Sequence, residues 1–152
     1  MTAELPDFVA LQKCYNDESF STGARAELRR VSEPDELAFV PALYRLFPGQ
    51  CPDIRHRRLA YLLPYCEHSE SARSLGFQLA EAGIAEARVL QVSRSHDPLD
   101  IVQFRRLLIH VKPKVDWNEF GRMVWYWNDH SRRQLVEDFY ITRFAPDKGE
   151  RK

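Results

Sequence analysis

The sequence predicts an all-α protein of roughly seven to nine helices, arranged as two small packed helical subbundles. Apolar residues recur at helical spacing along nearly the whole chain, and no sustained alternation of apolar and polar residues marks a strand. Residues typical of helix starts and stops separate these stretches. Because 44% of the 152 residues are hydrophobic and 12% are aromatic, the chain has enough apolar mass for one ordinary core.

The first two helices should lie before residue 30. Phe8, Leu11 and Tyr15 share one face of a predicted amphipathic helix. A polar loop follows this helix, and a second, short helix should then run through Leu28.

Ser32 is predicted to cap the next helix, with Pro34 in the first turn and Asp35 at the third position. Proline is tolerated there because the amide that it lacks has no partner in the first turn of a helix. Pro41 should interrupt this helix, and a Pro-Gly pair at 48–49 should stop it.

Helices in the middle of the chain also have local signals. Asp53 should cap a helix over residues 54–66, and Ile54 is one of the residues expected to face the core. The following helix should end at Gly83, because glycine is favoured just after the last turn of a helix. Another helix should follow at once, over residues 85–94.

Asp97 is predicted to cap a long helix, with a proline at the first helical position and Asp100 at the third. Leu99 and Ile109 are among the residues that should form its apolar side. The helix should end near Val111, because a proline follows two residues later.

Two further helices should complete the C-terminal half. Asp116 begins a helix over residues 117–127, and the last helix should carry residues 131–144. We expect an N-terminal subbundle of residues 1–83 and a C-terminal subbundle of residues 84–152, or one continuous domain made of both. No long linker or convincing internal repeat divides the chain.

The charge is balanced overall, with 22 basic and 22 acidic residues, which removes a high pI as an argument for nucleic-acid binding. The bias lies in the type of basic residue, since 17 are arginine and five are lysine. A guanidinium binds phosphate oxygens in pairs, whereas an ammonium acts as a point charge. Codon bias in a GC-rich genome produces the same excess, so composition alone leaves both explanations open.

Sequence signatures of enzymes and metal sites are missing. There is no Gly-rich phosphate loop, no G-x-S-x-G and no H-E-x-x-H. Cys66 and His68, with Cys51 and His56 upstream, lack the second close pair of a tetrahedral zinc site, so we expect no metal and no cofactor. The three cysteines fit a reducing compartment, and no apolar run is long enough to span a bilayer. We therefore expect a cytoplasmic protein without a membrane partner.

Arginines are predicted on the polar sides of several separate helices, often as adjacent pairs. The pairs are Arg29-Arg30, Arg57-Arg58, Arg105-Arg106 and Arg132-Arg133. This pattern is what sequence-independent binding of a nucleic-acid backbone requires, because phosphates recur whatever the sequence. The pattern also fits acidic partner proteins or internal salt bridges, and the residues alone do not decide between these.

Several segments in a fixed order resemble one family. The segments are "RRVSEPDEL", "PALYRL", "DIVQFRRLLIH", "DW" and "RRQLVEDFYIT". Together they are similar to the CasB-type small subunit of the type I-E CRISPR Cascade surveillance complex, over most of the chain from about Leu28 to Thr142. Each segment alone is weak evidence for the family, whereas the set of segments in this order is specific for it.

The resemblance implies an all-helical, non-enzymatic subunit that occurs in Cascade as a head-to-tail pair of copies. Its implied partners are the backbone subunits, the large subunit that reads the PAM, the crRNA and the target DNA. The subunit would help hold the hybrid of crRNA and target, together with the displaced strand. In such RNA-guided recognition, base pairing reads the sequence. The exchange of DNA duplex for RNA–DNA hybrid is nearly balanced, and protein contacts to the backbones shift it toward the hybrid.

The resemblance also implies nucleic-acid contacts at particular basic positions. Carried onto this sequence, they are Arg55, Arg88, Arg106 and Arg132, with Arg94 and Arg105 as neighbours. Relatives can have a basic residue after the second tryptophan of the "WNDHS" segment, where this chain has Asp129 and His130. His130 could supply part of that contact when protonated.

We therefore expect a non-catalytic Cascade subunit that binds nucleic-acid backbone non-specifically. The alternative is a purely structural spacer whose arginines pair with acidic surfaces of other subunits. A hydrolase that uses the scattered histidine and glutamate residues is a weaker third hypothesis, which metal or nuclease dependence of the purified protein would reveal.

Overall fold

The computed structural model describes residues 5–146, and within this range the chain is almost entirely helical. Its elements in chain order are α1 (Phe8–Asn16), α2 (Thr22–Arg30), η1 (Pro34–Phe39), α3 (Pro41–Leu46), α4 (Ile54–Leu62), η2 (Leu63–Tyr65), β1 (Glu67–His68), α5 (Leu75–Glu81), α6 (Glu86–Arg94), α7 (Leu99–Val111), β2 (Lys114–Val115), α8 (Trp117–Trp125) and α9 (Asp129–Arg143). The all-α prediction is confirmed. None of the described helices is both long and apolar enough to cross a membrane.

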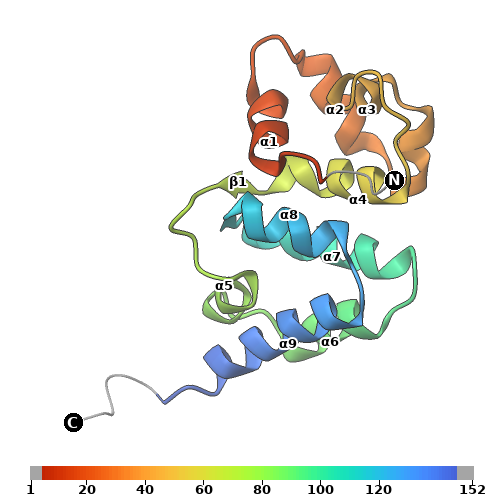
Figure 1. The fold of residues 1–152 in the computed structure, drawn as a ribbon. Helices are drawn as coiled ribbons and strands as arrows, with labels where there is room; N and C mark the ends of the chain where they lie inside the picture. Colours follow the sequence, from red (N-terminus) through yellow and green to blue (C-terminus); the bar gives the residue numbers. More distant parts are fainter. Residues whose placement is uncertain (1–4, 147–152) are drawn as a thin grey trace.

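The helices form three groups in space (Figure 1). Helices α1 to α4 gather at one end of the molecule, α7 and α8 lie across the middle, and α5, α6 and α9 form the other end. Helix α8 packs against α1 and α4, while α5 packs chiefly against α9. The predicted division at residue 83 stays a prediction. Helix α5 lies before residue 83, whereas its main packing neighbour α9 lies after residue 83.

One hydrophobic cluster connects these groups. Its members come from every α-helix, from Phe8 in α1 to Phe139 in α9. The bulkiest side chains that are completely buried are Trp117, Tyr61, Phe104 and Phe139. Aromatic rings of this size remove much apolar surface from water, which is the dominant favourable contribution to folding of a small domain.

Two short strands are the exception to the helical prediction. Residues 67–68 (β1) pair in parallel with residues 114–115 (β2). Next to them, the Trp117 amide donates to His68 Nδ1 at 3.1 Å, and the indole donates to the Cys66 carbonyl at 3.0 Å. Strands of two residues leave no alternating pattern in the sequence, so only the contacts across about fifty positions reveal them.

The predicted cap at Ser32 is wrong by one residue. The extended residue before the turn is Glu33, and residues 34–39 form a 3-10 helix. The Glu36 carboxylate accepts hydrogen bonds from the amides of both Ser32 and Glu33, at 2.6 Å each. A capping carboxylate from inside the turn thus replaces the hydroxyl that we expected.

Asp97 does not cap the long helix either. Pro98 has a non-helical backbone conformation and α7 begins at Leu99, which moves the helix start away from the Asp97 side chain. By contrast, the predicted caps Asp53 and Asp116 are confirmed, because each carboxylate accepts from amides of the first turn.

Three residues that we expected on apolar faces are in fact partly exposed. They are Ile54, Leu99 and Ile109, with exposed fractions of 39%, 49% and 44%. In α7 the buried positions include Ile101, Phe104 and Leu108. Apolar residues occur on more than one face of α7, and packing against its neighbours decides which face is buried.

Candidate nucleic-acid interface

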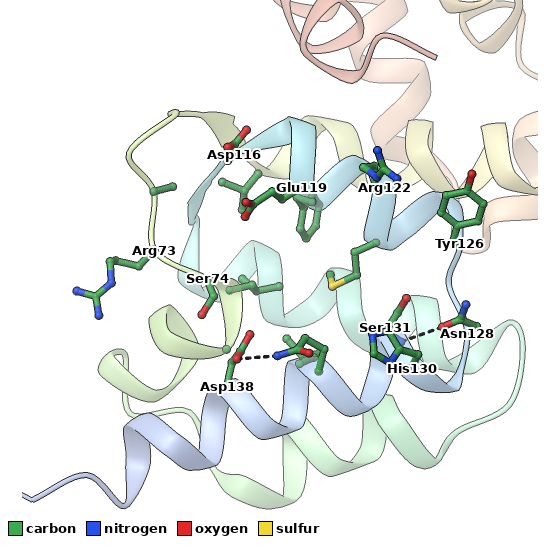
Figure 2. Close-up of a pocket in the computed structure, with 18 residues that line it drawn as sticks. Arg73, Ser74, Asp116, Glu119, Arg122, Tyr126, Asn128, His130, Ser131 and Asp138 are labelled. Atoms are coloured by element: carbon green, nitrogen blue, oxygen red, sulfur yellow. Dashed lines mark hydrogen bonds between the residues drawn. The ribbon is translucent and has the colours of Figure 1, made fainter. Parts of the chain in front are cut away.

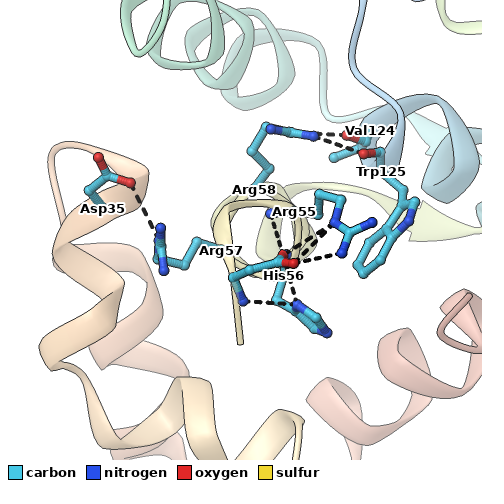
Figure 3. A network of polar contacts seen from close by, with 8 residues as sticks. Asp35, Arg55, His56, Arg57, Arg58, Val124 and Trp125 are labelled. Carbon is cyan, nitrogen blue, oxygen red and sulfur yellow. Dashed lines mark hydrogen bonds and ion pairs between the residues drawn. The ribbon is translucent and has the colours of Figure 1, made fainter. Parts of the chain in front are cut away.

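Arg55 lies in the first turn of α4 and makes two contacts inside the protein (Figure 3). Its Nη2 is 2.7 Å from Asp53 Oδ2, and its guanidinium lies 4.5 Å from the centre of the Trp125 ring. Hydrogen bonds from Arg55 hold the pKa of Asp53 well below its usual range. Because Asp53 is also the N-cap of α4, Arg55 supports the start of this helix.

The next two arginines of α4 have structural partners (Figure 3). Arg58 donates from Nε to the Val124 carbonyl at 3.2 Å and from Nη2 to the Trp125 carbonyl at 2.8 Å, which satisfies the C-terminal end of α8. Burial lowers the pKa of Arg58. Arg57 Nε lies 3.4 Å from Asp35 Oδ1 and links α4 to η1.

Arg105 connects α7 to the end of α2. Its Nη1 donates to the Val31 carbonyl at 2.6 Å, and its guanidinium lies 4.4 Å from the centre of the Tyr61 ring. The carbonyl just beyond the last turn of α2 has no partner within its helix, so Arg105 supplies one.

Arg132 forms a largely buried ion pair. Its Nη1 donates to Asp100 Oδ2 at 3.2 Å, and its Nη2 donates to Asp129 Oδ1 at 2.7 Å. The same Asp100 oxygen accepts from the Trp127 indole at 2.8 Å. Asp100 lies in the first turn of α7, as predicted, and is only 2% exposed, so it also holds together α7 and α9.

The other three candidate arginines have no such contacts in the described part of the chain. Within residues 5–146, the side chains of Arg88, Arg94 and Arg106 make no hydrogen bond or ion pair. Arg94 and Arg106 are exposed, and Arg88 is half-buried. These guanidiniums can therefore bind an external phosphate without breaking an internal contact.

Arg29, Arg105 and Arg106, called the basic cluster below, act by their charges on one or both of two tyrosines, and Arg105 also stacks on the Tyr61 ring. Burial raises the pKa of Tyr65, and the positive charges of Arg105 and Arg29 partly offset this rise. Burial raises the pKa of Tyr61 to about 12, again against the charges of Arg105 and Arg106. The sequence left the role of Arg29 open, since no local signal shows that the end of α2 lies beside α7.

Asp129 and His130, which stand where relatives can have a basic residue, lie at the start of α9. Asp129 pairs with Arg132, whereas His130 is exposed and lies at the rim of a groove between α8 and α9 (Figure 2). Among residues 5–146, no three histidine, cysteine or acidic residues come together in a way that could hold a metal ion.

Comparisons with known proteins point to one family of proteins. No protein-family model matches the chain. The chain is 38% identical over 152 residues to the CRISPR system Cascade subunit CasB of Escherichia coli (strain K12), an alignment that covers 90% of this chain and 94% of that protein.

A solved structure gives the same result in three dimensions. The fold is similar to a chain in the crystal structure of E. coli Cascade bound to a PAM-containing dsDNA target, with a TM-score of 0.81 and 38% identity. The match covers 92% of this chain and 99% of that chain. The similarity therefore extends over the whole length of the relative's fold.

Proposed function

Because the chain belongs to the CasB family of type I-E CRISPR Cascade subunits, we propose that it binds nucleic-acid backbone without sequence preference inside such a complex. Its partners there are the other Cascade subunits, a second copy of itself, the crRNA and the target DNA. It holds the hybrid of crRNA and target, together with the displaced strand, and it catalyses no reaction.

The observation that carries this proposal is the set of arginines that make no hydrogen bond or ion pair within residues 5–146. Arg88 and Arg94 on α6 and Arg106 on α7 are available to phosphate oxygens. Arginine suits such contacts because its planar fork binds two oxygens of one phosphate. Contacts of this kind hold a strand in place and carry no information about its sequence.

The basic cluster adds a second point of contact. Arg29 and Arg106 are exposed, whereas Arg105 is half-buried and donates to the Val31 carbonyl. The cluster combines residues of α2 and α7, two helices that are distant in the sequence. Together these helices place positive charge on one part of the surface.

The same structure gives some support to the alternative, a structural spacer. Arg55, Arg105 and Arg132 are held by partners within the chain, and the overall formal charge is zero. If Arg88, Arg94 and Arg106 paired with acidic surfaces of other subunits, the protein would need no contact with nucleic acid.

The test is target-DNA binding by reconstituted Cascade across a series of salt concentrations. One particle contains the unchanged subunit, one lacks it, and one contains the triple variant Arg88→Ala, Arg94→Ala, Arg106→Ala. Exposed Arg143, on the last turn of α9, provides a matched control as Arg143→Ala. We expect the triple variant to weaken binding and to make the plot of log affinity against log salt about 2 to 3 units less steep.

The spacer hypothesis gives a different result. If the triple variant enters the particle in normal amounts and DNA binding keeps its affinity and salt slope, the nucleic-acid proposal is wrong. If the variant fails to enter the particle, the arginines serve contacts between subunits.

A further inference from the structure

A groove of about 570 Å³ lies between α8 and α9, beside the start of α5 (Figure 2). Residues at helical spacing form its two long walls. They are Glu119 and Met123 on α8 with Tyr126 directly after its end, and His130, Gln134 and Asp138 on α9. Because eight residues separate the ends of the α9 wall, the groove is about 12 Å long, or roughly two turns of a helix.

Much of the lining between these walls is apolar. Leu75 of α5, Phe120 of α8 and Leu135 of α9 are buried and line the groove. Met123 is half-buried beside them. An unbranched thioether adapts to apolar groups of different shape, which suits it to a docking surface.

The charged rim is divided between the two ends of the groove. Asp116, Glu119 and Asp138 lie toward one end together with a single cation, Arg73, whereas Arg122 and His130 lie toward the other (Figure 2). None of these side chains forms an ion pair with another residue in the range 5–146. The rim thus offers charges of both signs to an occupant.

The α9 wall of the groove is fixed by close packing. Helix α5 approaches α9 at Gly76, where a Cβ would lie 2.5 Å from the Asp138 Cβ and 2.7 Å from the Leu135 carbonyl oxygen. Any larger residue would push the two helices apart. The groove is therefore preformed, and binding need not pay to order this wall.

We propose that this groove binds an amphipathic α-helix presented by another protein subunit of the Cascade particle. This inference rests on the proposed function for its setting. The occupant has apolar residues at i, i+3 or i+4 and i+7, basic residues toward the Glu119 end and acidic residues toward the Arg122 end. A nucleic-acid strand is disfavoured, because at the Glu119 end its phosphates would lie beside three carboxylates and only one arginine, Arg73.

Site-specific photo-crosslinking tests the occupant. The photoreactive residue p-benzoylphenylalanine replaces Tyr126, an exposed aromatic residue at the rim, in reconstituted Cascade. Phe39 provides the matched control, because it is 90% exposed and lies outside the groove. We expect crosslinks from position 126 to a helical segment of another subunit, identified by mass spectrometry, and none to that segment from position 39.

Other crosslinking results overturn the proposal. Crosslinks from position 126 to crRNA, to target DNA or to a second copy of this chain would show a different occupant. A particle that contains the modified subunit and yields no crosslink at position 126 would show an empty groove.

Charge reversal at the rim separates this inference from the proposed function. Glu119→Lys should reduce incorporation of the subunit into the particle by about tenfold, since like charges face each other across an interface. Glu137→Lys is the matched control, because Glu137 is exposed on α9 and does not line the groove.

The two proposals fail in different ways. If Glu119→Lys incorporates like the Glu137→Lys control, the groove proposal is wrong, and the loss of DNA affinity in the arginine variant still supports nucleic-acid binding. If Glu119→Lys loses incorporation while the arginine variant binds DNA normally, the groove proposal holds and the nucleic-acid proposal fails.

Discussion

Replacing Arg132 by methionine should destabilise the fold rather than only remove a surface charge. The change leaves the Asp100 carboxylate, which is 2% exposed, without its cationic partner. Removing one member of a buried ion pair typically costs about 3 to 5 kcal/mol. The Arg132 side chain is 20% exposed, and Asp100 keeps hydrogen bonds from the Trp127 indole and the Ile101 amide, so we expect a smaller loss of about 2 to 3 kcal/mol.

Urea denaturation followed by circular dichroism measures this loss as a change in the free energy of unfolding. Arg133→Met provides the control, because Arg133 is exposed and should change the free energy by less than about 0.5 kcal/mol. Adding Asp100→Asn to the Arg132→Met variant should recover part of the stability, since the buried charge is then gone.

A loss below about 0.5 kcal/mol for Arg132→Met would refute the reasoning, because it would show that Asp100 does not depend on this guanidinium. The result also bears on function. If Arg132 holds the fold together, a fall in DNA binding by an Arg132 variant does not by itself identify a phosphate contact.

Two further predictions concern packing and pH. Gly76→Ala should destabilise the protein by about 1 to 3 kcal/mol in urea denaturation, because the added Cβ would meet the α9 backbone. Gly23→Ala, the control, should stabilise the protein by up to about 1 kcal/mol, because there is space for a Cβ in the first turn of α2. Equal effects of the two changes would contradict the packing argument. Burial raises the pKa of Tyr61 from 10.0 to about 12, so folding favours the neutral phenol. The stability from this residue should be complete below pH 10 and decline as the pH rises toward 12, and Tyr61→Phe should make the free energy of unfolding fall less steeply in this interval.

Helix boundaries were predictable where the signal was local. Asp53 and Asp116 cap their helices through amides two or three residues away, so the residue type at one position was sufficient. The prediction failed at Ser32, where a carboxylate four residues later takes the amide. Local patterns thus give the existence of a helix more reliably than its first residue.

The candidate arginines were only partly interpretable from sequence. The sequence placed all six on predicted helices, but the partners of Arg105 and one partner of Arg132 lie far along the chain. Arg105 binds a carbonyl 74 residues away, and Arg132 binds a carboxylate 32 residues away. No local pattern distinguishes these residues from Arg106, which makes no hydrogen bond or ion pair within residues 5–146.

The sequence by itself determined that the chain is helical, where most helices lie, and which family it resembles. Helical periodicity and capping depend on residues within about two turns of each other, and the ordered segments of the family are contiguous in the chain. Only the tertiary structure decided which guanidiniums have partners among residues 5–146, which have none there, and that α8 and α9 leave a groove whose rim carries charges of both signs. Those properties depend on distances between helices, and these distances are set by the packing of the whole core.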